Sequence, residues 1–182
     1  VKLYLMLAVV LFFFVGCIGA IVLGRGQDFV EYALYVDHTA GLPNREKCDE
    51  VLERFSQKPV EPPFACVYLK IDNIAQLNMA HGYGGGTNAI AAMGRLMRLC
   101  AENFGFVGYN NGAQFMGIFE NCTKERAEYF LLTLKSAVDG YNAEHVGAAI
   151  EYHAAGAGVE AGEVNTAREI LRRCITKLGA PA

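Results

Sequence analysis

The hydrophobic pattern divides the chain into one uninterrupted apolar segment and a longer part in which apolar and polar positions alternate. Leu3 to Leu23 contains no charged side chain. A helix of that length, rising about 1.5 Å per residue, crosses a hydrocarbon core of about 30 Å. We therefore predict a transmembrane helix over residues 3–23. A short connecting helix over residues 24–36 is expected to follow, because Phe29, Val30 and Leu34 recur at helical spacing.

Two alternatives to a membrane span remain open. The hydrophobic core of a secretory signal usually runs only about 7 to 15 residues and ends at a small-residue cleavage site. Phe14–Cys17 faintly resembles a lipoprotein cleavage site, yet apolar sequence continues beyond Cys17 to Leu23.

The chain begins with Val1 rather than Met, so either a sensory region precedes it or the first codon is not ATG.

Beyond residue 36, the apolar periodicity switches between that of helices and that of strands. Apolar runs bounded by Pro, Gly or Asn predict strands at 64–71, 104–109, 114–119 and 149–159. Helical spacing predicts helices at 44–57, 73–81, 87–103, 123–141 and 166–178. This order suits an α+β sandwich in which helices flank an antiparallel-rich sheet.

Turn and capping residues mark several boundaries between these elements. Asn111 and Gly112 predict a hairpin, because Asn-Gly is the strongest short-range hairpin signal. Gly82–Gly86 is expected to be a loop before the helix at 87–103. Thr166 and Glu169 form a capping box for the last helix.

Charge and cysteine usage narrow the functional classes. A net charge of −3 and an isoelectric point near 5.8 argue against nucleic-acid binding, which depends on neutralising many phosphates. The 6 cysteines include no C-x-x-C pair and no zinc-like spacing. We interpret them as small core residues in a reducing cytoplasm. The 4 histidines are scattered, without a partner at ligand spacing, and we assign none a catalytic role.

Three polar segments of the second part resemble the motifs of one family. Asp37–Arg45 (DHTAGLPNR), Lys70–Gly82 (KIDNIAQLNMAHG) and Tyr109–Phe115 (YNNGAQF) follow one another along the chain. In order and spacing they resemble D-x-L-T-G-L-P-N-R, D-I/V-D-x-F-K-x-I-N-D-x-x-G-H and R-Y/F-G-G-D/E-E-F of the GGDEF (diguanylate cyclase) family. The resemblance covers roughly Asp37 to Leu178. It implies a palm-like α+β fold, related to the ferredoxin-like fold, over residues 37–182.

The same resemblance implies that the metal-binding charges have been lost. Active relatives join two GTP molecules into cyclic di-GMP, with divalent cations held by the first Asp of the D-I/V-D motif and the first acidic residue of the turn. Lys70 and Ala113 stand at these positions, and Gln114 stands at the neighbouring acidic one. Asp72 is the only remaining metal-ligand candidate, and we favour a role for it in capping the helix that begins near Asn73.

The nucleotide-binding positions are only partly retained. Asn78 matches the family asparagine that contacts guanine, whereas Thr87 replaces the aspartate that reads the same base. Gly82 begins a glycine-rich turn that is weak evidence for a phosphate site. Asn111 and Gly112 are explained by the hairpin alone. The inhibitory R-x-x-D motif that many relatives carry is absent, because residues 102–105 read Glu-Asn-Phe-Gly.

These observations lead to one main hypothesis and two alternatives. The first is a catalytically inactive GGDEF-like domain, anchored in the bacterial inner membrane with the domain in the cytoplasm, acting through protein contacts or weak GTP sensing. The second is a working diguanylate cyclase that binds Mg²⁺ through Asp72, Asp37 or other groups; otherwise no cofactor is expected. The third is a purely structural, dimerising module whose surface binds another membrane protein. The partners expected in addition to the membrane and GTP are a second copy of the chain, in a homodimer, or another signalling protein.

Overall fold

The computed structural model describes residues 12–18, 20 and 34–179. The chain divides into two compact units, Val1–Val36 and Asp37–Ala182. In the first unit, residues 12–18 and 20 are helical, with exposed side chains. The remainder of the predicted membrane span and most of the predicted connecting helix lie outside the described residues; of the latter, residues 34 and 35 are helical. No helix within the described ranges combines the length and the apolar character that crossing a membrane requires.

The second unit is built on an antiparallel sheet, which has four strands in the described part of the chain, in the order β2-β3-β1-β4. The strands are β1 (Phe64–Ile71), β2 (Phe106–Tyr109), β3 (Gln114–Glu120) and β4 (Tyr152–Gly158). β1 lies inside the sheet, and every residue of it except Lys70 is buried, which explains its nearly continuous apolar sequence. The four predicted strands are confirmed, with β1 at the predicted bounds.

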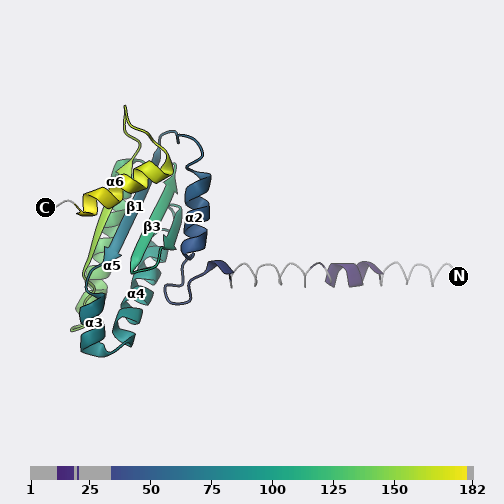
Figure 1. Cartoon of the computed structure of the whole chain (residues 1–182). Coiled ribbons are helices and arrows are strands. Elements are labelled where there is room, and N and C mark those ends of the chain that lie inside the picture. The colour runs from purple at the N-terminus through teal and green to yellow at the C-terminus, as the bar shows by residue number, and fades with distance from the viewer. Residues whose placement is uncertain (1–11, 19, 21–33, 180–182) are drawn as a thin grey trace. The chain divides into compact units, whose positions relative to one another are not determined.

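The described part of this unit has five helices: α2 (Arg45–Arg54), α3 (Ile74–His81), α4 (Gly84–Cys100), α5 (Lys124–Glu144) and α6 (Ala167–Gly179). α4 and α5 cover one face of the sheet and α2 and α6 the other, while α3 packs against α4 (Figure 1). Val67 and Leu69 of β1 point into the core beneath α4 and α5, whereas Cys66 and Tyr68 point into the core beneath α2 and α6. This alternation is the two-residue period of a strand buried on both faces.

The core beneath α4 and α5 is rich in aromatic side chains. Phe104, Phe119 and Phe130 contact one another with ring centroids 5.1 to 5.6 Å apart in tilted or edge-on geometry. Phe119 and Phe130 are fully buried. The core beneath α2 and α6 contains instead the buried thiols of Cys48, Cys66 and Cys174. The prediction that the cysteines are core residues is confirmed for these three and for Cys122, whereas Cys17 is exposed.

The glycine-rich segment differs from its prediction. α4 begins at Gly84, so Gly84–Gly86 is helical rather than a loop. A Cβ at Gly85 would lie 2.3 Å from the carbonyl oxygen of Leu77. A Cβ at Gly86 would lie 2.8 Å from Asn78 Oδ1. Gly85 and Gly86 therefore permit α3 and α4 to approach closely, a requirement that resembles a loop signal when only the sequence is read.

Candidate functional site

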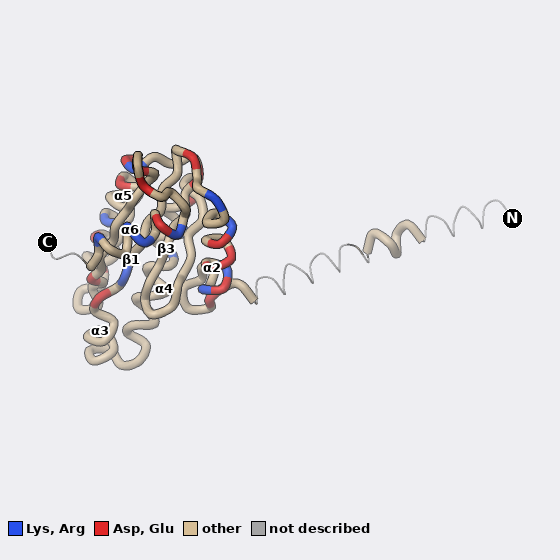
Figure 2. Tube along the Cα trace, turned by 45° about the horizontal axis from the view of Figure 1, so that its top comes forward, with Lys and Arg blue, Asp and Glu red and all other residues tan. Residues whose placement is uncertain are grey.

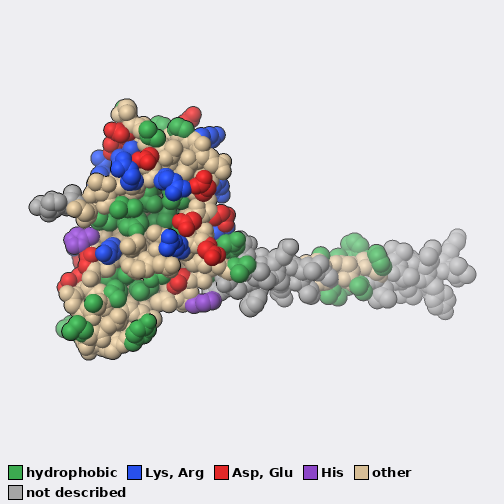
Figure 3. Space-filling model, in the orientation of Figure 1, with side chains coloured by type: hydrophobic (Ala, Val, Ile, Leu, Met, Phe, Trp, Pro, Cys, Tyr) green, Lys and Arg blue, Asp and Glu red, His purple; other side chains and the backbone are tan. Residues whose placement is uncertain are grey.

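Lys70, which stands where the first metal-binding carboxylate is expected, belongs to a row of polar side chains that crosses three strands. Lys70 of β1 is paired with Gln114 of β3 on one side and with His153 of β4 on the other. Side chains directly opposite one another in antiparallel strands share a face of the sheet. The row therefore lies on the face that carries α6, seen in Figure 3, where apolar side chains form a band among charged ones.

Gln114 is held by a neighbour on the same face. The Tyr68 hydroxyl donates a hydrogen bond to Gln114 Oε1 at 2.5 Å. Burial raises the pKa of Tyr68, although a hydrogen bond with Asn110 opposes the shift. The hydroxyl therefore remains a neutral donor at physiological pH. Gln114 thus completes a packed polar contact at a position where the family resemblance implies an acidic residue.

Asp72 does not cap α3, so that prediction is wrong. Its carboxylate is paired with the imidazole of His153, with Asp72 Oδ2 and His153 Nδ1 2.5 Å apart. The N-cap residue of α3 is Asn73, which makes no side-chain capping bond. Instead the buried Asn73 amide donates to the carbonyl of Ala149 at 2.8 Å and accepts from the N–H of Glu151 at 3.1 Å. β4, which runs beside β1, thus supplies the partner of Asp72, and the residues just before β4 supply the partners of Asn73.

The β2–β3 hairpin is present, but its turn is centred one residue later than predicted. The Gln114 N–H donates to the Asn111 carbonyl at 2.9 Å, so the central residues are Gly112 and Ala113. Asn111, Gly112 and Ala113 have φ of 60°, 57° and 61°. A left-handed alanine costs about 1 to 2 kcal/mol. The Ala113 methyl group is buried in the core beneath α4 and α5, and its carbonyl accepts from the Ile71 N–H at 3.0 Å.

The three nucleotide-binding candidates lie around the α3–α4 connection. Asn78 Oδ1 accepts the Gly86 N–H at 2.8 Å, and Thr87 Oγ1 donates to the Tyr83 carbonyl at 3.4 Å. Gly82 has a φ of 72°, which glycine adopts without strain. Residues 73–94 contain no Lys, Arg, Asp or Glu, so this end of the second unit is tan in Figure 2. These residues therefore supply hydrogen-bonding groups but no cation for a triphosphate.

Potential metal ligands do not converge in the described part of the chain. It contains no group of three or more His, Cys, Asp or Glu side chains that is arranged to hold a metal ion. The Asp37 carboxylate accepts the backbone N–H groups of Thr39 and Ala40 at 2.9 and 2.8 Å, which closes the turn before α2.

The sequence also matches a family model over nearly the whole second unit. The model is described as "Diguanylate cyclase, GGDEF domain" and matches residues 34–177. The chain belongs to the GGDEF family. No curated protein matches the sequence at a significant level.

Solved GGDEF structures share the fold at low sequence identity. The GGDEF domain of DgcB from Caulobacter crescentus, in complex with cyclic di-GMP, is 18% identical, with a TM-score of 0.66, and the match covers 80% of this chain and 88% of that one. A DgcB structure that includes the coiled coil is 19% identical, with a TM-score of 0.70 and coverage of 91% and 89%. SiaD from Pseudomonas aeruginosa, in complex with its activator SiaC, is 19% identical, with a TM-score of 0.66 and coverage of 90% and 65%.

The sequence analysis of this GGDEF domain did not predict that His153 and Tyr68 contact residues of the polar row. His153 was read as an isolated histidine, and Tyr68 as an ordinary strand residue. Both meet their partners only through strand register, because His153 is 81 residues from Asp72 and Tyr68 is 46 residues from Gln114. The available clue was the strand prediction itself, because side chains two residues apart on a strand, such as Tyr68, Lys70 and Asp72 just after it, lie on one side of the chain.

Proposed function

We propose that this GGDEF domain is anchored in the bacterial inner membrane, makes no cyclic di-GMP and acts in cyclic di-GMP signalling through protein contacts or weak GTP binding. The observation that carries the proposal is Lys70, exposed beside Gln114 at the place of the expected metal carboxylates.

Electrostatics supports a loss of metal binding. A lysine ammonium about 4 Å from a divalent cation, at an effective dielectric constant near 20, is disfavoured by about 8 kcal/mol. Outward movement of the exposed Lys70 side chain reduces that figure. Even about 2 kcal/mol lowers metal occupancy more than tenfold.

Asp72 by itself offers little compensation. A single carboxylate makes a weak Mg²⁺ site unless substrate phosphates complete the octahedral shell. The carboxylate is also already engaged by His153. A metal that used Asp72 would have to compete with this contact.

An active diguanylate cyclase is the alternative, and the description of the matching family model favours it. In that case Asp72 would hold Mg²⁺ together with the phosphates of GTP. Because the alternative depends on this carboxylate, an Asp72→Ala variant would lose activity.

Product formation tests the proposal directly. The purified chain is incubated with GTP and either Mg²⁺ or Mn²⁺, and cyclic di-GMP is quantified against a reaction without protein. We expect no product above that control. Product that increases in proportion to protein concentration, and that Asp72→Ala abolishes, would establish the cyclase instead. In the double variant Lys70→Asp with Ala113→Glu, we expect tighter Mn²⁺ binding without turnover.

GTP binding and protein contact are separable outputs of an inactive domain. We expect millimolar GTP to raise the melting temperature more than ATP does if guanine recognition survives. Asn78→Ala is a poor probe, because its side chain also holds the Gly86 N–H. A protein-contact role is supported by SiaD, which was solved with its activator SiaC.

The membrane anchor is tested by fractionation. We expect the chain to stay with membranes after high-salt and alkaline washing. Phe13→Arg should weaken insertion by about 2.5 to 3.5 kcal/mol at the helix centre. Recovery of the unmutated chain in the soluble fraction would contradict the anchor.

A further inference from the structure

β4 is an edge strand, and half of its backbone groups point away from the sheet. The Asp72 N–H donates to the Glu151 carbonyl at 2.9 Å, and the Val159 N–H donates to the Phe64 carbonyl at 3.1 Å. Odd-numbered residues of this segment therefore bond to β1. In an antiparallel pair, the residues between them direct their N–H and C=O groups outward. The outward groups belong to even-numbered positions.

The N-terminal end of this edge is covered by a side chain of α5. Asn142 Oδ1 accepts the Ile150 N–H at 2.8 Å, and Asn142 Nδ2 donates to the Ile150 carbonyl at 3.0 Å. One amide side chain thus satisfies both outward groups, as the backbone of a neighbouring strand would.

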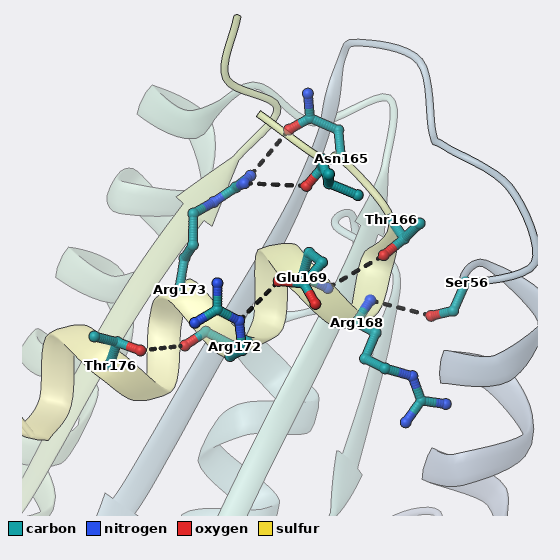
Figure 4. A network of polar contacts seen from close by, with 9 residues as sticks. Ser56, Asn165, Thr166, Arg168, Glu169, Arg172, Arg173 and Thr176 are labelled. Carbon is teal, nitrogen blue, oxygen red and sulfur yellow. Dashed lines mark hydrogen bonds and ion pairs between the residues drawn. The ribbon is translucent and has the colours of Figure 1, made fainter. Parts of the chain in front are cut away.

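The C-terminal end of the edge is covered by cations of α6. Lys177 Nζ donates to the Gly156 carbonyl, and an Arg173 guanidinium nitrogen donates to the Gly158 carbonyl, both at 2.9 Å. The same Arg173 nitrogen donates to Asn165 Oδ1 at 3.0 Å, which fixes the guanidinium over the end of the strand (Figure 4). Charged side chains at an edge are a recognised protection against unwanted strand pairing.

At the C-terminal end only the carbonyls are covered, because no hydrogen-bond partner is present for the N–H groups of Gly156 and Gly158 in the described chain. Between the two ends, both outward groups are open at two residues. In the part of the chain that the structure describes, the outward N–H and C=O groups of Tyr152 and Ala154 have no hydrogen-bond partner. Both residues line a groove of about 780 Å³ between β4 and α5. That volume lies within the range of about 300 to 1,000 Å³ that is typical of ligand sites.

The walls of the groove differ in chemistry. Leu131 and Leu132 of α5 give it an apolar side, and Leu132 is 66% exposed. Four carboxylates also line it, against a single lysine: Asp72, Glu128, Asp139 and Glu151, with Lys135. Lys135 is paired with Asp139 at 2.6 Å and His153 with Asp72, whereas Glu128 and Glu151 have no ion pair in the described chain. The groove is therefore acidic on balance.

We propose that this open stretch of β4 binds an extended segment of a partner protein, in which apolar residues alternate with Lys or Arg. The segment adds a strand beside Tyr152 and Ala154, whose four outward backbone groups it satisfies. Side chains alternate between the faces of a strand. Its apolar residues therefore contact Leu131 and Leu132, and its cations on the opposite face approach Glu151.

This inference names the contact surface for the protein-contact role proposed above, and it rests on that role. Its test is independent of nucleotide chemistry. Cyclic di-GMP synthesis would contradict the inactive-domain proposal while leaving peptide binding intact, and loss of peptide binding would leave the synthesis assay unchanged.

The probe is a fluorescein-labelled octapeptide of alternating valine and lysine, titrated with the purified full chain and followed by fluorescence anisotropy. We expect saturable binding. An alternating valine–glutamate peptide and a valine–lysine peptide with N-methylated backbone nitrogens should each bind at least about tenfold more weakly, because they lose charge complementarity and main-chain hydrogen bonds respectively.

Matched variants locate the site. Ala154→Pro removes an outward N–H without removing a bond to β1, which edge strands tolerate. It should weaken binding about tenfold. The pair Glu128→Gln and Glu151→Gln should weaken it several-fold, most at low salt. The exposed control pair Glu102→Gln and Glu144→Gln lies outside the groove and should bind as the parent does.

Three results would overturn the proposal. One is that the N-methylated valine–lysine peptide binds as tightly as the unmethylated one. This result would overturn the proposal even if Ala154→Pro did not fold. Another is unchanged binding by a folded Ala154→Pro variant. The third is a dimer, measured by light scattering, that Ala154→Pro dissociates while the peptide does not bind, because a second copy of this chain would then occupy the edge.

Discussion

Two regions that share β1 differ in how tightly their side chains are packed. One is the core beneath α4 and α5, and the other is the polar row at the end of β1. In the core, Phe115, Phe119 and Phe130 are fully buried and tightly surrounded. In the polar row, Lys70 and His153 are exposed, and contacts run between single pairs of side chains. A buried aromatic ring has many neighbours that must move if it changes, whereas an exposed side chain has few.

This difference explains how a chain can keep the fold of its family while the residues expected to bind metal are replaced. The fold depends on apolar side chains filling the two cores, and these are retained. The expected metal carboxylates contribute to function rather than packing, so their replacement by Lys70 and Ala113 leaves the fold in place. Function has to be argued from the site and not from the fold.

The largest expected effect is in the aromatic core. Phe130→Ala should lower the free energy of unfolding by about 3 to 5 kcal/mol, because it empties a site where Phe104 and Phe119 contact the ring. Urea denaturation of the purified chain measures the change. A loss below about 1 kcal/mol would mean that this core is loosely packed and would remove the contrast with the polar row.

A close backbone approach gives the next effect. A Cβ at Gly94 of α4 would lie 2.0 Å from the Ala40 carbonyl oxygen, in the turn that Asp37 closes. Gly94→Ala should therefore cost about 1 to 3 kcal/mol through overpacking. The control is Gly140→Ala in α5, which meets nothing within 4 Å. It should stabilise the helix by about 0.5 to 1 kcal/mol. Equal effects of the two changes in a thermal melt would contradict the packing argument.

Within the polar row, the expected effects are smaller. Gln114→Ala removes the acceptor of the buried Tyr68 hydroxyl and should cost about 1 kcal/mol. Asp72→Ala removes a contact with His153 in which the side chains are 75% exposed for His153 and 36% for Asp72, so we expect a cost of at most about 1 kcal/mol. Chemical denaturation compares both with Phe130→Ala. If Asp72→Ala proved as damaging as Phe130→Ala, the polar row would be a structural centre.

The smallest effect at neutral pH concerns the thiols beneath α2 and α6. Burial raises the pKa of Cys48 and of Cys174 from 9.0 to about 12. Unfolded thiols therefore lose their protons near pH 9, whereas the folded ones keep theirs to about pH 12. Stability from this source is complete below pH 9 and falls between pH 9 and 12. We expect the melting temperature to drop over that window, and to drop less in Cys174→Ala. A flat profile would contradict the burial of these thiols.

Much of the fold was readable from local pattern. The four strands and the helices of the second unit were predicted with the right type and order, because each carries its own periodicity. The main error in the fold was the start of α4, where glycines that serve close helix packing were read as a loop. The hairpin was predicted from Asn111 and Gly112, but its turn is centred on Gly112 and Ala113, since the register of β2 and β3 decides which residues close it.

By itself, the sequence determined the order of the elements, the two-faced burial of β1 and the motif pattern of the GGDEF family, including Lys70 and Ala113 at the expected metal positions. These are local properties of periodicity and residue type. Only the tertiary structure decided that Asp72 pairs with His153, that Asn73 binds the residues just before β4, and that both outward backbone groups of the β4 edge are open at Tyr152 and Ala154. The physical reason is that each of these contacts depends on strand register and helix placement, which bring together residues dozens of positions apart. The local sequence of a single segment does not determine either of them.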